Sequence, residues 1–145
     1  MSDAIPSITL VRRLKAPPER VWAAWTEPAL MLLWFGPQTA HAEQAEADLQ
    51  LGGRFRVVLR EDGGDRHEAH GRYDVIEPPS RLVFAWNWAS TPERVSRVTV
   101  VLRAIADGTE LTLTHDRFAD ADAARAHERG WSGSLDRLEA LAASL

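Results

Sequence analysis

The sequence predicts an α+β domain in which a curved antiparallel sheet of about seven strands wraps around one long C-terminal helix. Three observations predict this class. Segments with apolar residues at every second position alternate with turn signals along residues 39–116, as in consecutive antiparallel hairpins. Residues 120–145 instead place apolar residues three and four apart, which is typical of an amphipathic helix. A helix of about 25 residues spans roughly 37 Å and a strand of about 12 residues roughly 40 Å, so the two can lie side by side.

The N-terminal part predicts one strand followed by two short helices. Residues 7–14 are rich in β-branched and apolar side chains, and a pair of prolines ends this strand. Proline in a first helical turn and Glu19 near the positive end of the helix dipole favour a helix from there to about Trp25. Thr26 is expected to cap the second helix, which has a proline just inside its start and ends at the Gly-Pro pair that begins at residue 36.

The rest of the chain predicts six strands and the long helix. The expected strands are residues 39–49, 54–61, 67–77, 81–88, 93–105 and 109–116. The first of these is charged and weakly apolar, so it is expected near an edge of the sheet. Asp107-Gly108 is a type I′ hairpin signal. Asp120 or Asp122 is expected to cap the final helix, in which Gly130 and Gly133 weaken the helix and leave room for a close approach.

Composition and charge exclude several classes of function. A length of 145 residues suits one domain over residues 1–145, and the net charge of −4 argues against a nucleic-acid binder. The absence of cysteine excludes disulfides and thiolate sites and suits a cytoplasmic protein. Residues 1–6 carry no secretory signal, and the longest apolar run is far below the roughly 18 residues of a membrane helix. Neither export nor membrane insertion is therefore expected.

Six tryptophans against one tyrosine make the aromatic content unusual. Tryptophan offers a large apolar surface with a single N–H donor, and it suits both cores and ligand pockets. We expect an apolar pocket between the sheet and the long helix, the alternative being a solid core filled by the same side chains. The expected pocket residues are Trp25, Trp34, Phe35, Phe55, Tyr73, Phe84, Trp86, Val100, Leu113 and Trp131.

Two histidines are the sharpest polar candidates. His115 shares a strand face with two leucines, and His127 lies one turn before a tryptophan on the apolar side of the long helix, so both are expected to point inward. There they would orient a ligand's polar group, or one would act as a general base; the alternative is a hydrogen-bonded core histidine. His67 and His70 face opposite sides of a strand, so no metal site is expected, and no cofactor-binding motif is present.

Four segments of the chain resemble one known superfamily. They are APPERVWAAWTEP at residues 16–28 with WFGP at 34–37, GGRF at 52–55, GRYDVIEPPSRLVF at 71–84, and GTELTLTH at 108–115 with GW at 130–131 and LDRL at 135–138. Together they resemble the helix-grip (START-like) superfamily known as SRPBCC, which includes lipid-transfer domains and polyketide cyclases. Within it the chain is most similar to the family related to the C-terminal domain of the activator of heat-shock-protein ATPase. The resemblance covers nearly the whole chain.

The resemblance implies a cavity between sheet and long helix, with a mouth gated by the two short helices. It implies binding of a small hydrophobic or aromatic ligand. The alternative is a cofactor-independent cyclase, dehydratase or isomerase in the same cavity, with His115, His127 and Tyr73 as its acid–base candidates. A co-chaperone-like interaction is least favoured, because that relative joins this domain to a separate N-terminal domain for which 145 residues leave no room. The identity of the ligand and a homodimer are open.

Overall fold

The computed structural model describes residues 6–145. Residues 1–5, on which the expectation of no secretory signal partly depends, lie outside the described residues. The elements are β1 (Ile8–Leu14), α1 (Pro18–Thr26), α2 (Pro28–Trp34), β2 (Ala40–Ala47), β3 (Arg54–Glu61), β4 (Arg66–Glu77), β5 (Arg81–Trp88), β6 (Ser96–Ile105), β7 (Gly108–Asp116) and α3 (Ala121–Ala142). This order confirms the predicted helix-grip fold. None of the helices within residues 6–145 is long and apolar enough to cross a bilayer.

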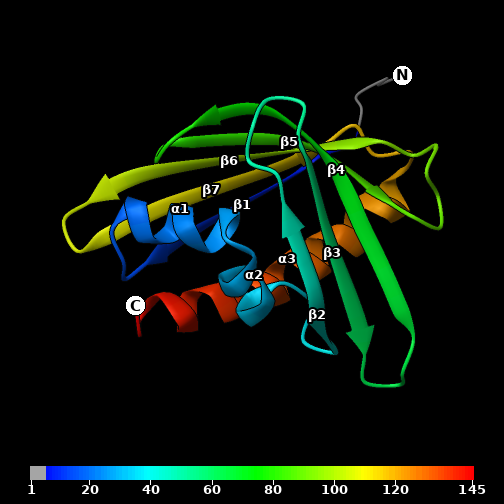
Figure 1. Cartoon of the computed structure of the whole chain (residues 1–145), viewed down its shortest axis with the longest axis horizontal. Coiled ribbons are helices and arrows are strands. Elements are labelled where there is room, and N and C mark those ends of the chain that lie inside the picture. Colours follow the sequence, from blue (N-terminus) through cyan, green and yellow to red (C-terminus); the bar gives the residue numbers. More distant parts are fainter. Residues whose placement is uncertain (1–5) are drawn as a thin grey trace.

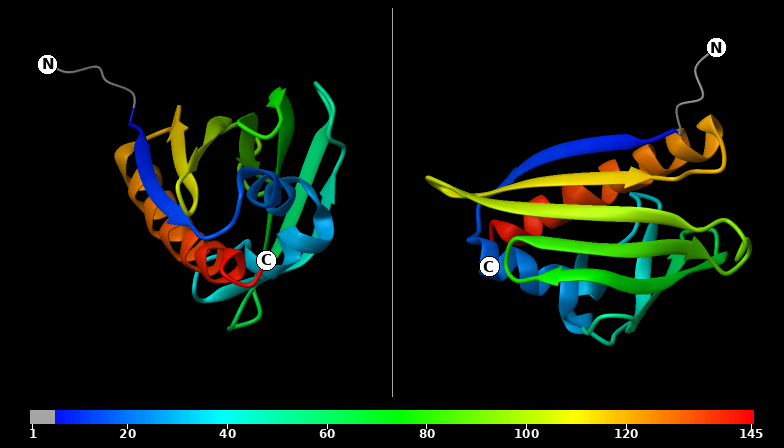
Figure 2. Two further views of the ribbon diagram at one scale, coloured as in Figure 1. Left: turned by 90° about the vertical axis from the view of Figure 1, so that its left-hand side faces the viewer. Right: turned by 90° about the horizontal axis from the view of Figure 1, so that it is seen from above.

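The seven strands form one antiparallel sheet in the order β1-β7-β6-β5-β4-β3-β2. Figures 1 and 2 show this sheet curling into a half-barrel, with α3 running across its hollow side. The strand pairing shifts register between Ala42 and Gln44 on β2 and between Tyr73 and Val75 on β4. Such bulges bend a strand and increase its twist, which helps to fold the sheet back on itself. The charged strand β2 stands at an edge, as predicted.

The helix α3 is held over the concave face by its apolar side. Trp131, Leu135 and Leu138 on that side are buried. Asp120 caps the helix, since its Oδ1 accepts a hydrogen bond from the backbone N–H of Ala123 at 2.8 Å. From β1, Arg12 donates to the carboxylate of Asp136 at 2.6 Å. These contacts place the C-terminal half of α3 against the β1 edge of the sheet.

The helices α1 and α2 fill one end of the concavity. Val21 and Trp25 on α1 and Met31 and Trp34 on α2 are almost completely buried. The indole N–H of Trp34 donates to the carbonyl oxygen of Ala24 at 2.9 Å, which joins the two helices. This end of the half-barrel is therefore packed solid, and an open space can remain only toward the other end.

The prediction that Thr26 caps α2 is wrong. Thr26 is the last residue of α1, and its hydroxyl donates to the carbonyl oxygen of Trp22 at 2.9 Å. A threonine inside a helix commonly uses its hydroxyl in this way, on the carbonyl one turn earlier. The N-cap of α2 is Glu27, and its side chain makes no capping hydrogen bond.

Two predictions around β6 are also corrected. The strand expected from residue 93 begins at Ser96, because residues 88–94 form consecutive turns with backbone bonds from Thr91 to Trp88 and from Arg94 to Thr91. The hairpin before β7 exists, but Ile105 pairs with Gly108, so its two turn residues are 106 and 107. Neither of them is among the residues of 6–145 that have positive φ. The turn is therefore not type I′, which needs positive φ at both positions.

Gly130 and Gly133 lie nearly one turn apart on α3 in opposite surroundings. A Cβ atom on Gly133 would lie 2.9 Å from the backbone nitrogen of Gln38 and 3.2 Å from the Cα of Pro37. A Cβ atom on Gly130 would meet none of the described atoms within 4 Å. The bare backbone of Gly133 therefore lets α3 approach the segment after α2, whereas Gly130 faces open space.

These surroundings predict opposite effects of the same substitution. We expect Gly133→Ala to lower the free energy of unfolding by about 1–2 kcal/mol, because the overlap with Gln38 outweighs the gain in helix propensity. Gly130→Ala meets no obstacle and is expected to raise it by about 1 kcal/mol. Urea denaturation of both variants measures the difference. Equal shifts in the two midpoints would contradict the packing described for Gly133.

Candidate functional site

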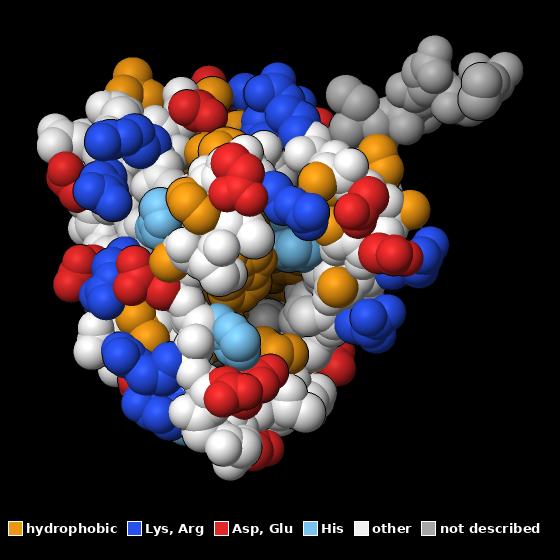
Figure 3. All heavy atoms as spheres, turned by 90° about the vertical axis from the view of Figure 1, so that its right-hand side faces the viewer, with side chains coloured by type: hydrophobic (Ala, Val, Ile, Leu, Met, Phe, Trp, Pro, Cys, Tyr) orange, Lys and Arg blue, Asp and Glu red, His pale blue; other side chains and the backbone are white. Residues whose placement is uncertain are grey.

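A cavity of about 300 Å³ lies between α3 and the inner face of β3, β4 and β5. Figure 3 looks onto the right-hand end of Figure 1 and shows a hollow with hydrophobic side chains at its floor and histidines around it. The cavity is lined by Phe35, Gly36, Pro37, Ala40, Leu59, Glu61, His67, Trp86, Trp88, Ser90, Ala126, His127, Gly130, Trp131 and Ser134. It is thus the unfilled end of the half-barrel, away from α1.

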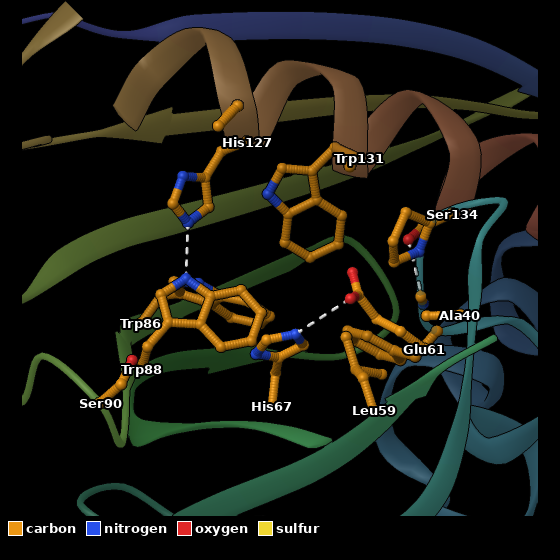
Figure 4. Close-up of a pocket in the computed structure, with 15 residues that line it drawn as sticks. Ala40, Leu59, Glu61, His67, Trp86, Trp88, Ser90, His127, Trp131 and Ser134 are labelled. Atoms are coloured by element: carbon orange, nitrogen blue, oxygen red, sulfur yellow. Dashed lines mark hydrogen bonds and ion pairs between the residues drawn. The ribbon is translucent and has the colours of Figure 1, made fainter. Parts of the chain in front are cut away.

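Aromatic rings form much of the cavity wall. Trp131 comes from α3 and Trp86 from β5, and their ring centroids are 5.2 Å apart. Phe35, which follows α2, lies 5.9 Å from Trp131, and Trp88 lies 5.4 Å from Trp86 in an edge-to-face arrangement. Figure 4 shows Trp86 and Trp88 on one side of the space and Trp131 on the other. These rings contact one another and form a continuous wall, against which an aromatic guest can pack in the edge-to-face or offset geometry that aromatic pairs favour.

Behind Trp131 lies a buried chain of hydrogen bonds that determines the state of His115. The indole N–H of Trp131 donates to Nδ1 of His115 at 2.9 Å. The hydroxyl of Ser96 donates to the carbonyl oxygen of Trp86 at 3.0 Å, so the 2.6 Å contact between Ser96 and His115 must use the N–H of Nε2. His115 is therefore neutral with its proton on Nε2, and both ring nitrogens are engaged.

His127 on α3 is engaged in a similar way at the rim of the cavity. Its Nε2 accepts the indole N–H of Trp88 at 2.9 Å, a bond drawn in Figure 4. Its Nδ1 lies 2.7 Å from the carbonyl oxygen of Ala123, which can only accept, so Nδ1 carries the proton. The neutral His127 therefore links α3 to β5 and has no free ring nitrogen.

Burial keeps both histidines uncharged. Burial lowers the pKa of His115 from 6.5 to about 2, and the neighbouring His127 adds to this effect. Burial also lowers the pKa of His127, although its hydrogen bond to the carbonyl of Ala123 opposes the change. Both imidazoles therefore act as fixed hydrogen-bonding groups at neutral pH.

Two charged or titratable side chains of the cavity come from the end of β3 and the start of β4. Glu61 reaches from β3 toward Trp131, and its carboxylate lies 3.5 Å from Nε2 of His67 (Figure 4). Sequence reasoning missed Glu61 and treated His67 only as a metal candidate. The alternation of β3 contained the missing signal, since Phe55, residues 57 and 59, and Glu61 share one face. Within residues 6–145 no three histidine, aspartate or glutamate side chains are placed to hold a metal ion.

Ser134 secures the cavity wall where α3 meets the segment after α2. Its Oγ accepts a hydrogen bond from the backbone N–H of Gly36 at 3.1 Å, and both residues line the cavity. The contact joins residues 98 positions apart, which no local pattern in the sequence could reveal. The residues next to Ser134, a glycine and a leucine, gave no reason to single it out from the sequence.

The structure divides the twelve predicted site residues into two layers. Phe35, Trp86, His127 and Trp131 line the cavity. The other eight are buried in the hydrophobic interior outside the cavity lining: Trp25, Trp34, Phe55, Tyr73, Phe84, Val100, Leu113 and His115. Trp25 touches the lining layer, with its ring 5.8 Å from that of Trp131. Burial, with a smaller effect from the charge of Asp48, raises the pKa of Tyr73 to about 12, so its hydroxyl stays protonated.

Comparison with known proteins identifies relatives over the whole fold. The model of the family described as Activator of Hsp90 ATPase homolog 1-like protein matches residues 15–143. A solved protein from Chromobacterium violaceum is 28% identical with a TM-score of 0.85, covering 94% of this chain and 97% of its own. The AHSA1 protein from Silicibacter pomeroyi is 27% identical with a TM-score of 0.84, covering 95% and 98%. No curated protein sequence matches the chain.

Proposed function

The chain belongs to the activator of Hsp90 ATPase homolog 1-like family of the SRPBCC superfamily, and on that premise we propose that it binds a small hydrophobic or aromatic molecule in the cavity under α3. One observation carries the proposal: side chains leave about 300 Å³ open beside an aromatic wall at one end of the half-barrel. Ligand pockets in proteins begin near this size. An engineered apolar cavity of about 150 Å³ already holds benzene, so a two-ring molecule is the appropriate scale.

The apolar walls alone support weak binding. Burying about 150 Å² of ligand surface at about 25 cal/mol per Å² yields roughly 4 kcal/mol, which corresponds to millimolar affinity. Tighter binding needs polar contacts, and Glu61, His67 and Ser90 are polar side chains of the cavity that could make them. The proposed ligand is therefore an apolar body with a polar group at this side of the cavity.

The same geometry gives less support to a cyclase, dehydratase or isomerase that uses the predicted acid–base residues. A general base needs a free lone pair within reach of the substrate. His115 and His127 each have both ring nitrogens engaged, and His115 lies behind Trp131 rather than on the cavity surface. Tyr73 lies outside the lining, and its raised pKa keeps it from acting as a base. Binding without chemistry at these three residues is the better-supported function.

A substitution at Gly130 that fills the cavity with a side chain tests the proposal. A ligand at ten times its dissociation constant adds about 1.4 kcal/mol to the stability, or roughly 3–6 °C in Tm for a domain of this size. We expect such a shift with 3-methylindole or naphthol in the wild-type protein and in Gly130→Ala. Gly130→Phe is expected to abolish the shift, because its ring would project into the space that Gly130 borders.

The alanine variant is the matched control, since it changes the same helical position without filling the cavity. Thermal denaturation followed by circular dichroism measures all three proteins with and without ligand. An equal shift in Gly130→Phe would place the ligand elsewhere. The absence of any shift in the wild-type protein across apolar compounds would reject the function.

A further inference from the structure

The charges around the cavity are unbalanced in a way that bears on the class of ligand. Among the residues that line it, Glu61 is the one carboxylate, and no lysine or arginine lines it. The remaining titratable lining residues are His67 and His127, and His127 is held neutral by its hydrogen bonds and burial. A ligand that enters this space therefore meets a negative charge and no permanent positive charge.

The carboxylate of Glu61 is available to a ligand. The Glu61 side chain is 41% exposed, and its one ion-pair partner within residues 6–145 is His67, at 3.5 Å. This distance is too long for a good hydrogen bond, so both carboxylate oxygens can still accept. On the outer face of the same sheet, by contrast, Glu43 is held by Arg60 at 2.7 Å and by Arg66 at 2.9 Å. Arginines thus neutralise the outer carboxylate but leave Glu61 free.

The aromatic walls add to this preference and lack donors for an anion. The faces of tryptophan and phenylalanine rings carry negative charge density and attract cations. The indole N–H groups of Trp88 and Trp131 already donate to His127 and His115. The N–H of Trp86 has no partner among the described residues, but it is buried and inaccessible to a ligand. The aromatic walls therefore offer no free indole N–H donor to an anion.

We propose that the ligand of this cavity is a protonated amine carried on an aromatic or alkyl body, with its ammonium group at Glu61 and its body against the lining rings of Trp88 and Trp131. The inference rests on the proposed function and specifies the ligand class for the same site. Glu61 supplies the counter-charge, and its position at the end of β3 places that charge opposite α3 (Figure 4). Carboxylic acids of the same shape meet repulsion from Glu61 and find no free indole N–H donor.

Three compounds with one indole ring and different charge test the inference: tryptamine, 3-methylindole and indole-3-acetate. Isothermal titration calorimetry at pH 8, where imidazoles are neutral, gives each dissociation constant. We expect tryptamine to bind about fivefold to tenfold more tightly than 3-methylindole, as an exposed ion pair plus a cation–π contact would provide. Indole-3-acetate is expected to bind more weakly than 3-methylindole.

A charge-removing variant assigns the effect to one residue. Glu61→Gln is expected to reduce the affinity for tryptamine to the value for 3-methylindole. The affinity for 3-methylindole itself is expected to stay unchanged. Glu139→Gln makes the same change at an exposed position of α3 outside the cavity lining, and it is expected to behave like the wild-type protein. Of the three compounds, only tryptamine should bind more weakly when the salt concentration is raised. This provides a test on the unmodified chain.

The outcomes separate the two proposals. If 3-methylindole binds but tryptamine binds no more tightly, or if Glu61→Gln leaves the preference intact, the amine inference is overturned and the ligand-binding function stands. If none of the three compounds binds and Gly130→Phe behaves like the wild-type protein in the thermal measurements, the function itself is rejected. Tighter binding of tryptamine that is lost in Glu61→Gln supports both the ligand-binding function and the amine inference.

Discussion

Replacing Trp131 by alanine is expected to lower the free energy of unfolding by about 4–5 kcal/mol, the upper range for a large-to-small change in a core. Trp131 is 4% exposed, and its ring packs against those of Trp25, Phe35 and Trp86. Its removal would merge the void left behind with the existing cavity. It would also leave Nδ1 of the buried His115 without its donor, which adds the cost of an unpaired polar group. Chemical denaturation measures the loss directly.

One further variant separates the packing of the Trp131 ring from the hydrogen bond of its N–H, and a second serves as a control. Trp131→Phe keeps an aromatic ring but removes the hydrogen bond to His115, and it is expected to cost about 2–3 kcal/mol. Leu33→Ala, at a residue that is 59% exposed, is expected to change stability by less than about 0.5 kcal/mol. A loss of less than 1 kcal/mol for Trp131→Ala would mean that Trp131 does not hold α3 to the aromatic core.

Acid is expected to destabilise the protein well above the range in which carboxylates titrate. His115 has a pKa of about 2 in the folded protein and an ordinary value near 6.5 when unfolded. Below pH 6.5 the unfolded chain takes up a proton that the folded chain refuses, so the stability present above pH 6.5 is lost as the pH falls. The expected loss from His115 is about 1.4 kcal/mol per pH unit, or about 2 kcal/mol between pH 6.5 and 5. His127, whose pKa is also lowered by burial, acts in the same direction.

This window is free of the main carboxylate contributions. Arginine partners lower the pKa values of Glu43, Glu68 and Glu110, so these residues lose stabilising charge only at pH values below their ordinary 4.5. Urea denaturation across the window, repeated on His115→Leu, is expected to show a slope lower by about 1.4 kcal/mol per pH unit in the variant. Parallel curves would show that His115 does not titrate on unfolding. If the variant does not fold, the proton NMR signals of His115 in the wild-type protein should stay unchanged from pH 7.5 to 5.

The strands and helices could be predicted because each depends on neighbours in the sequence. The alternation in residues 54–61 and 81–88 predicted β3 and β5 to the residue. The same local reasoning failed at Thr26, whose hydroxyl donates to the carbonyl of Trp22 and does not cap α2. It also failed at residues 93–95, because residues 88–94 form turns rather than extend β6.

The candidate site was only partly predictable, for a different reason. Strand alternation indicated that Trp86 faces inward, and helical spacing indicated the same for Trp131, but neither pattern contains information on depth below the inward face. Tyr73 was expected in the pocket on the same footing as these two. Trp86 and Trp131 line the cavity, whereas Tyr73 lies in the packed interior outside it. Glu61 shares the inward face of β3 but was overlooked, because a carboxylate at the end of a strand is usually solvated.

The sequence by itself determined the order of the elements, the antiparallel sheet, the amphipathic side of α3 and the set of inward-facing aromatic residues, since all of these follow from local spacing and turn chemistry. The tertiary structure alone decided where the space remains. That space depends on how far the bulged sheet curls and on how α3 is held, through pairs such as Arg12 with Asp136 and Gly36 with Ser134. Contacts between residues about a hundred positions apart leave no periodic signal in the chain, so the cavity and its free carboxylate became visible only in three dimensions.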